Sequence, residues 1–281
     1  MKSVNEQLIY CFTYVRITNK GKDMSVMTER ILNNTSIHYY VNGAESETAI
    51  IFLHPAFGNH TCFDTQLDYL KNYKLITVDL IGHGKSIGKG KLEDTAEYIN
   101  SIMQAEKINK INLVGVSLGA VLVQDFANKY PEKVASLMCI GGYDINNFAK
   151  ELQGSNSKQQ MKMMFRAFFS IKTFAEENKK ISAYTTDAQE KFYKMNLEFK
   201  KSSFKYLASI GKMVNKQQTH ERNYPLLIGV GEYDCDLAKK AAQMWHTSEP
   251  GSEYTEFAGA GHIVNMDTPE QFNKALEKIL R

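Results

Sequence analysis

The chain has 281 residues, 43% of them hydrophobic and 23% charged, and a formal net charge of +3. This length and composition are ordinary for a globular protein with a sizeable core, and the nearly balanced charge gives no indication of nucleic acid as a partner. No apolar run comes near the length of about 18 residues that a membrane-spanning helix needs, so no membrane span is expected.

The four cysteines show neither the spacing of a metal site nor that of a redox motif. We therefore expect reduced thiols, a reducing compartment and a cytoplasmic protein. Four histidines, His38, His60, His220 and His246, also show no metal spacing together. No metal and no cofactor are predicted, and the sequence leaves the oligomeric state open.

The first 28 residues stand apart from the rest of the chain. The pattern of a folded domain begins near Glu29, so we expect residues 1–28 to be an N-terminal extension that is disordered or packs on the surface. Two short apolar runs follow, Arg30–Leu32 and Ile37–Val41. Asn33-Asn34-Thr35 separates them, which predicts a β-hairpin.

Between residues 49 and 140, apolar runs alternate with helical patterns. The runs are Ala49–Leu53, Leu75–Val78, Ile111–Val116 and Val134–Ile140. Continuous apolar runs are typical of strands buried on both faces, and strands that alternate with helices indicate a doubly wound, mostly parallel sheet. In such sheets the functional groups gather at the carboxyl ends of the strands.

The pattern changes between Tyr143 and Asn223, where strand signals vanish and lysine, methionine, phenylalanine and glutamine dominate. We predict that residues 143–223 are a helical cap inserted in the core. One helical face of it is apolar and carries Met161, Met164, Phe165, Phe168 and Phe169. This stripe is either packing between insertion and sheet or the lining of an acyl pocket, and both can hold.

Strand signals return at Leu226–Val230 and at Glu253–Phe257, and a last helix begins with Pro269 in its first turn. The expected fold is therefore α/β, with a doubly wound sheet of about eight strands. Its core spans residues 29–142 and 224–281, on either side of the cap.

Ser117 stands in Gly115-Val116-Ser117-Leu118-Gly119, between an apolar run and a helical pattern. A serine on such a sharp strand-to-helix turn is a nucleophile elbow, in which glycines two residues before and after avoid a collision of side chains. The turn lifts the hydroxyl off the sheet and aims the Leu118 N–H at a developing oxyanion. The alternative is a glycine-rich helix start that packs tightly or binds phosphate, but the lysine of a P-loop is missing.

A serine nucleophile needs a base, and the base needs an orienting carboxylate. Asp234 and His262 come after Ser117 in the chain, each just past a predicted strand. Together with the segments His54–Gly58 and Asp79–Ser86, these motifs make the chain beyond its N-terminal extension resemble a capped, esterase-like serine hydrolase of the α/β-hydrolase fold superfamily.

The resemblance implies a catalytic triad of Ser117, Asp234 and His262. A rival acid is Asp144, because some members of the superfamily place the acid after the strand that here ends at Ile140. Asp234 is preferred because the Gly-Glu-Tyr that precedes it matches the family pattern better.

The resemblance also implies an oxyanion hole made by the backbone N–H groups of Ala56 and Leu118. Pro55 takes the place of the glycine that is usual after His54, and proline has no N–H. Ala56, the next residue, keeps its N–H and is the expected donor to the oxyanion, and the N–H of Phe57 is the alternative donor. His54 itself is expected to be structural and to hold this loop by a hydrogen bond.

We therefore predict a serine hydrolase that cleaves a small carboxylic ester or a related acyl bond through an acyl-enzyme. Its partner would be a small-molecule acyl substrate, held in a pocket to which Phe57, Met164, Phe165 and Phe168 contribute. The alternatives are a carbon–carbon bond hydrolase or a perhydrolase of the same fold, or a ligand receptor that keeps the triad and turns over slowly. Fold analogy alone does not choose among them.

Overall fold

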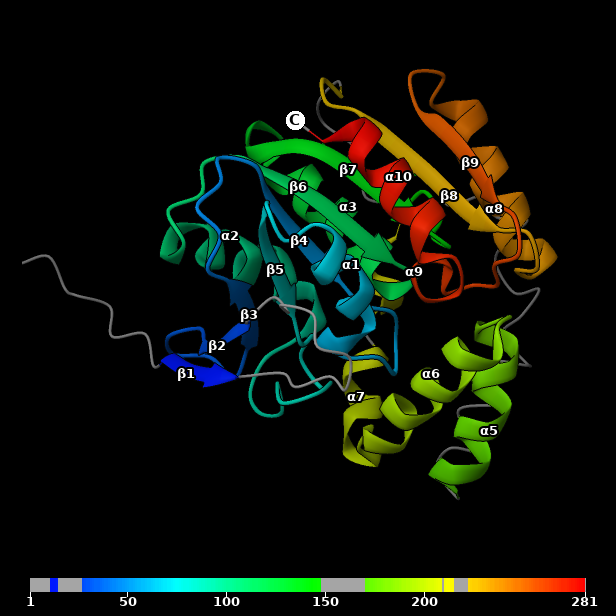
Figure 1. The fold of residues 1–281 in the computed structure, drawn as a ribbon, viewed down its shortest axis with the longest axis horizontal. Helices are drawn as coiled ribbons and strands as arrows, with labels where there is room; N and C mark the ends of the chain where they lie inside the picture. The colour runs from blue at the N-terminus through cyan, green and yellow to red at the C-terminus, as the bar shows by residue number, and fades with distance from the viewer. Residues whose placement is uncertain (1–10, 15–26, 148–169, 209, 215–221, 281) are drawn as a thin grey trace, which may run out of the picture.

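The computed structural model describes residues 11–14, 27–147, 170–208, 210–214 and 222–280. In this part of the chain one sheet has nine strands in the order β1-β2-β3-β5-β4-β6-β7-β8-β9. From β5 to β9 neighbouring strands are parallel, whereas β1, β2 and β3 are antiparallel to their neighbours. The prediction of a mostly parallel sheet is confirmed (Figure 1).

In the parallel part of the sheet the strand bounds lie within one residue of the expected runs. The strands are β1 (Cys11–Tyr14), β2 (Met27–Ile31), β3 (His38–Asn42), β4 (Ala49–Leu53), β5 (Lys74–Val78), β6 (Ile111–Val116), β7 (Val134–Ile140), β8 (Leu226–Gly231) and β9 (Glu253–Phe257). All residues of β4, β6 and β8 are buried, because helices cover both faces of the sheet.

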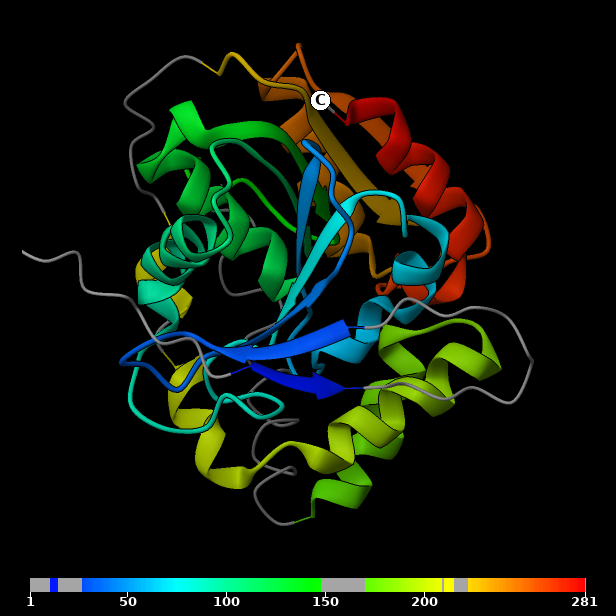
Figure 2. The ribbon, with the colours of Figure 1, turned by 60° about the vertical axis from the view of Figure 1, so that its left-hand side comes forward.

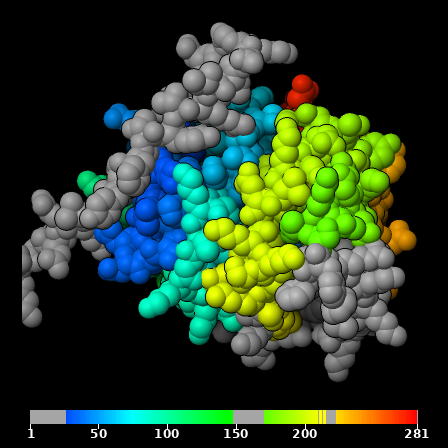
Figure 3. Space-filling model, turned by 90° about the horizontal axis from the view of Figure 1, so that it is seen from below, coloured from blue at the N-terminus to red at the C-terminus, as the bar shows by residue number. Residues whose placement is uncertain are grey.

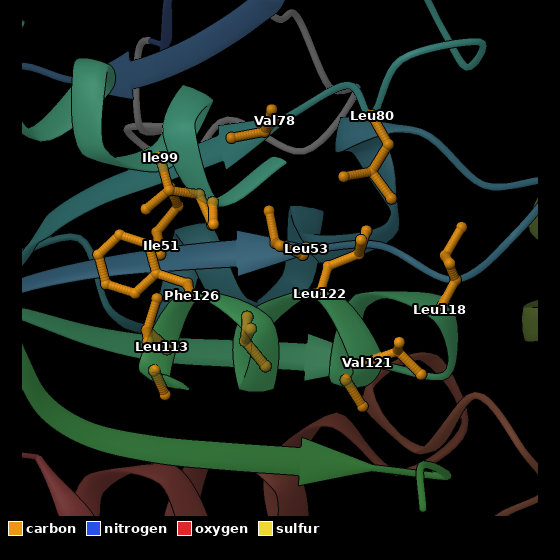
Figure 4. Close-up of a cluster of buried hydrophobic side chains, with 14 of the residues drawn as sticks. Ile51, Leu53, Val78, Leu80, Ile99, Leu113, Leu118, Val121, Leu122 and Phe126 are labelled. Carbon is orange, nitrogen blue, oxygen red and sulfur yellow. The ribbon is translucent and has the colours of Figure 1, made fainter. Parts of the chain in front are cut away.

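Side chains of one strand alternate between two cores. Ile51 and Leu53 of β4 belong to the first core, together with α2 (Thr95–Ala105), α3 (Leu118–Lys129) and Trp245 of α8 (Asp236–Ser248). Figure 4 shows how the side chains of this core interdigitate between the strands and the two helices α2 and α3.

The second core lies on the other face of the sheet. Ile50 and Phe52 of β4 point into it, where they belong to one cluster with residues of α1 (Asp64–Tyr69) and α10 (Pro269–Ile279). Helices on both faces make the sheet doubly wound, as predicted.

Two short parts of the expected N-terminal extension belong to the edge of the sheet. β1 pairs with β2 along its whole length, from Cys11 opposite Arg30 to Tyr14 opposite Met27 (Figure 2). β2 in turn begins at Met27, whose side chain is buried in the second core, so the domain starts before residue 29. The remaining residues of the expected extension lie outside the described residues.

Between β7 and β8 the regular elements that the structure describes are all helices. Its helices are α5 (Ile171–Ser182), α6 (Thr186–Glu198) and the short α7 (Phe204–Leu207). They lie together on the side of the sheet toward which the parallel strands point, and they cover much of the face seen from below (Figures 1 and 3). Among the described helices none is long and apolar enough to cross a membrane.

Candidate active site

Ser117 occupies a strained turn between β6 and α3. Its backbone has φ 54° and ψ −111°, a conformation that costs a non-glycine residue about 1–3 kcal/mol. The glycines around it are required sterically: a Cβ on Gly115 would lie 2.3 Å from the Gly119 carbonyl oxygen, and one on Gly119 would lie 2.0 Å from the Leu53 carbonyl oxygen. The geometry is therefore that of a nucleophile elbow.

His262 and Asp234 are brought together from two loops at the same end of the sheet. His262 Nδ1 donates a hydrogen bond of 2.8 Å to Asp234 Oδ2. The Asp234 side chain is 2% exposed and that of His262 is 25% exposed, so the carboxylate is buried behind an imidazole that reaches solvent. The second carboxylate oxygen, Oδ1, accepts from the backbone N–H of Cys235 at 2.7 Å.

This contact shifts the pKa values of both groups in the direction expected for an ion pair. Burial by itself raises the pKa of the Asp234 carboxyl, but the charge and hydrogen bond of His262 outweigh it and lower that pKa. For His262, burial lowers the pKa of the imidazole, and the charge and hydrogen bond of Asp234 reverse this into a net rise. The pair therefore favours a protonated His262 beside an ionised Asp234.

The rival acid Asp144 has a different environment. Its Oδ1 accepts a hydrogen bond of 2.8 Å from the backbone N–H of Asn146. Burial raises the pKa of its carboxyl, and hydrogen bonds from the backbone only partly offset this. Of the two candidate acids, the one bonded to His262 is Asp234.

Gly141, which the sequence did not single out, connects the serine to the histidine. The backbone N–H of Ser117 donates to the carbonyl oxygen of Ile140 at 2.7 Å. The next residue, Gly141, has φ 60°, and a Cβ there would lie 2.9 Å from His262 Cε1. The end of β7 therefore contacts both parts of the site: Ile140 binds the Ser117 turn, and Gly141 lies against the His262 ring. The pair Gly141-Gly142 directly after a strand was the signal for this close approach.

The loop after β4 forms a tight turn. The N–H of Gly58 donates to the Pro55 carbonyl oxygen at 3.1 Å, and Phe57, the third residue of this turn, has φ 66°. His54 Nδ1 donates to the same Pro55 oxygen at 2.8 Å, which is the loop-holding role predicted for it.

His54 is held in one neutral form. Its Nε2 accepts from the backbone N–H of Leu80 at 3.1 Å, and burial lowers the pKa of the ring to about 4. The imidazole therefore fixes the turn that carries Ala56 at any pH near neutrality. Leu118, the first residue of α3, has a backbone N–H without an acceptor inside the helix, as any residue in that position does.

Phe57 lies among aromatic rings of the inserted segment. Its ring centroid is 4.7 Å from that of Phe174 on α5, 4.9 Å from that of Phe199 and 5.9 Å from that of Phe204 on α7. The other predicted pocket residues, Met164, Phe165 and Phe168, lie outside the described residues.

Further contacts join the inserted helices to the loops at the carboxyl ends of the strands. Asn59 Nδ2 donates to Glu198 Oε2 of α6 at 3.0 Å, and Tyr206 of α7 donates its hydroxyl to the Gly88 carbonyl oxygen. No group of three or more side chains suited to a metal ion occurs among the described residues.

The chain belongs to the alpha/beta hydrolase fold family, whose model matches residues 48–269. This agrees with the sheet order, the elbow and the inserted helices between β7 and β8, and it confirms the predicted family.

Curated relatives of the chain are enzymes with different reactions. It is 26% identical over 262 residues, 85% of this chain and 89% of the relative, to a 2-hydroxy-6-oxononadienedioate/2-hydroxy-6-oxononatrienedioate hydrolase of Paraburkholderia phymatum. It is 20% identical over 258 residues, 86% of this chain and 83% of the relative, to a carboxylesterase of Bacillus subtilis.

Among solved structures, a thermophilic esterase from Thermogutta terrifontis superposes with a TM-score of 0.71 at 18% identity, over 96% of this chain and 97% of that one. At this level of identity the likeness is one of fold.

Proposed function

We propose that the protein is a serine hydrolase of small carboxylic esters or related acyl compounds, with Ser117, His262 and Asp234 as its triad. The observation that carries the proposal is the 2.8 Å hydrogen bond from His262 to Asp234, on a histidine that packs against Gly141 next to the Ser117 elbow. A hydroxyl on a strained turn, a partly exposed imidazole and a buried carboxylate are the three parts that nucleophilic acyl transfer requires.

In the acylation step, Ser117 Oγ attacks the carbonyl carbon of the substrate while His262 Nε2 accepts the hydroxyl proton. Asp234 stabilises the imidazolium and keeps its Nδ1–H directed inward. The N–H groups of Ala56 and Leu118 donate to the oxyanion of the tetrahedral intermediate. His262 then gives its proton to the leaving alcohol, and an acyl-enzyme remains.

In the deacylation step, water attacks the acyl-enzyme and gives a proton to His262. The same two N–H groups stabilise the second oxyanion, and collapse of the intermediate returns the proton to Ser117 Oγ and releases the acid. No cofactor takes part in either step.

The inserted helices act as a cap in this proposal. They rest on the loops after β4 and β5, so they stand over the end of the sheet that carries the triad. A cap there excludes water during acylation and offers an apolar wall, to which Phe57 contributes, for the acyl group.

Cleavage of a carbon–carbon bond is the second candidate. It is favoured by the similarity to the hydrolase of Paraburkholderia phymatum over most of both chains. Two parallel assays would separate ester hydrolysis from carbon–carbon cleavage. One uses 2-hydroxy-6-oxononadienedioate, the compound in the name of this relative, and the other uses p-nitrophenyl esters of increasing acyl length. Only one of these substrate classes should give a high kcat/KM.

The proposal is tested first at the serine. A fluorophosphonate should label Ser117, as identified by mass spectrometry, and Ser117→Ala should abolish both labelling and ester turnover. Ser101→Ala, on the outer helix α2, is the matched control and should keep both. Full turnover by a folded Ser117→Ala protein would refute the proposed function, and a single slow burst without turnover by the native protein would favour a receptor.

A further inference from the structure

The linker between α5 and α6 is bound to one buried carboxylate. Asp267, at the end of α9 (Val264–Asp267), is 8% exposed. Its Oδ1 accepts from the backbone N–H of Thr185 at 2.7 Å and from the Thr185 hydroxyl at 2.8 Å. Its Oδ2 accepts from the backbone N–H of Tyr184 at 2.9 Å. A carboxylate from the core thus holds two consecutive residues of the inserted segment.

The same carboxylate also holds the loop that carries His262. Asp267 Oδ2 accepts from the backbone N–H of Gly261 at 2.9 Å. On the other side of the histidine, the N–H of Ile263 donates to the carbonyl oxygen of Ser182, the last residue of α5, at 2.9 Å. Both chain neighbours of His262 are therefore tied to the junction between α5 and α6.

The junction reaches the acid as well. The ring of Tyr184 stacks on that of Tyr233, the residue before Asp234, with centroids 4.0 Å apart and planes at 11°. Gly261 has little space beside the linker, since a Cβ on it would lie 3.1 Å from the Tyr184 nitrogen. One short segment of the insertion thus contacts the immediate neighbours of both members of the His262–Asp234 pair.

We propose that Asp267 is a positioning residue for the base: by clamping the α5–α6 linker to the His262 loop, it holds the imidazole in line with Asp234. This inference rests on the proposed function, because it gives His262 the role of general base. It makes the inserted helices part of the catalytic scaffold as well as a cover for the substrate.

The chemistry of the clamp requires a carboxylate. All the hydrogen bonds above that Asp267 accepts come from neutral donors, and an ionised carboxylate offers only acceptors, which suits four converging N–H and O–H groups. Asparagine has the same shape, but an NH₂ group replaces one of the two carboxylate oxygens and would face the donors that this oxygen binds. Either the linker or the Gly261 N–H would then lose its partner.

The experiment compares Asp267→Asn with Asp187→Asn, which changes an exposed acid, the second residue of α6, that forms an ion pair with Lys191 on the surface. We expect Asp267→Asn to lower kcat/KM for a p-nitrophenyl ester by about 100-fold, mostly in kcat, because a misplaced base costs about that much. The acid limb of its pH profile should move to lower pH, because His262 loses contact with Asp234. Asp187→Asn should match the native protein in both respects.

A readout without substrate separates this proposal from the proposed function. The His262 Nδ1–H proton, hydrogen-bonded to Asp234, should give a downfield NMR resonance that is lost or moved upfield in Asp267→Asn and kept in Asp187→Asn. An active Ser117→Ala protein would refute the proposed function. The NMR resonance of His262 would still show in that case whether Asp267 holds the imidazole against Asp234. An unchanged resonance and pH profile in a folded Asp267→Asn protein would overturn the clamp alone.

Two milder substitutions at Thr185 test the clamp if the Asp267→Asn protein does not fold. Thr185→Val removes one donor to Asp267, whereas Thr185→Ser keeps the hydroxyl. We expect Val to lower kcat/KM by up to about tenfold and Ser to restore it. Equal activity of the two folded variants at the native level would count against the clamp.

Discussion

The imidazole of His262 lies against the backbone of Gly141, so closely that a methyl group on Gly141 would come within 2.9 Å of Cε1 and 3.0 Å of Nδ1. The same glycine has φ 60°, a conformation that costs other residues about 1–2 kcal/mol. A side chain at position 141 would thus displace the ring that bonds to Asp234 and that, in the proposed mechanism, accepts the proton of Ser117.

We predict that Gly141→Ala lowers kcat/KM by about 100-fold, because a shift of the order of 1 Å at the base has that effect. Its free energy of unfolding should fall by only about 1–2 kcal/mol. Gly251→Ala is the matched control, since a Cβ there meets nothing within 4 Å. Steady-state kinetics and thermal unfolding check both variants, and a fully active Gly141→Ala protein would contradict the placement of His262.

Replacing the acid should change the rate and its pH dependence together. Asp234→Asn should lower kcat by about 10⁴-fold, the loss seen when a triad no longer fixes the histidine tautomer. In the native protein the raised pKa of His262 places the acid limb of kcat/KM above about 6.5, the pKa of an unperturbed histidine. Without the Asp234 charge, burial dominates, and the limb should move to lower pH.

Asp144→Asn is the control for this prediction, because Asp144 is also a carboxyl after a strand, half-buried, but accepts its hydrogen bond from the Asn146 N–H. It should leave the rate and the acid limb near their native values. If the Asp144 variant were the inactive one, the assignment of the acid would be wrong.

The ion pair also affects stability with a definite sign. The lowered pKa of Asp234 contributes stability that is present above about pH 3.9, its unfolded pKa, and is lost as the pH falls through the folded value. The raised pKa of His262 contributes below about pH 6.5 and is lost as the pH rises through the folded value. Thermal unfolding from pH 3 to 9 should therefore depend less on pH in Asp234→Asn than in the native protein.

Phe57 should couple the inserted helices to the oxyanion loop. Phe57→Ala removes the ring contacts with Phe174, Phe199 and Phe204 while keeping the strained φ of 66°. We expect it to lose about 2–3 kcal/mol of stability and up to about 10²-fold in kcat, since the Ala56 N–H is no longer held in place. Exposed Leu197→Ala on α6 is the control. Unchanged kcat in the folded Phe57 variant would show that the turn keeps its shape without the ring.

The N-terminal strand should be dispensable for catalysis. Among the described strands, β1 pairs with β2 alone, at the edge of the sheet and away from β6 and β8, which lead to the proposed serine and acid. A chain that starts at Met24 should keep kcat/KM within about twofold, but it leaves the edge of β2 unpaired and should associate more readily. Kinetics and light scattering check this. A large loss of kcat would show that the N-terminal segment supports the site.

Much of this architecture is contained in local patterns. β4, β6 and β7 have the bounds of the expected runs, because a continuous apolar sequence between turn signals leaves little choice of where a strand begins and ends. Ser117, Asp234 and His262 could each be placed at a strand end from neighbouring glycines. The elbow was predictable since its cause is steric and local.

The parts that the sequence did not reveal depend on contacts between distant segments. Asp267 comes just before Pro269, where the sequence indicates only the start of a helix, yet its carboxylate binds the backbone of Tyr184 and Thr185. The pairing of β1 with β2 and the space that Gly141 leaves for His262 have the same character. No local propensity encodes which remote backbone will meet a given side chain.

The order of strands also has a consequence for how activity appears during folding. Ser117 and His262 lie about half the chain apart, because β8 pairs in parallel with β7 across the inserted segment and β9 then pairs with β8. Closing such long loops is slow, because their entropy is lost before the contacts form. During refolding, helical structure should therefore return early, and ester turnover should return only with the last strands, as a late kinetic phase.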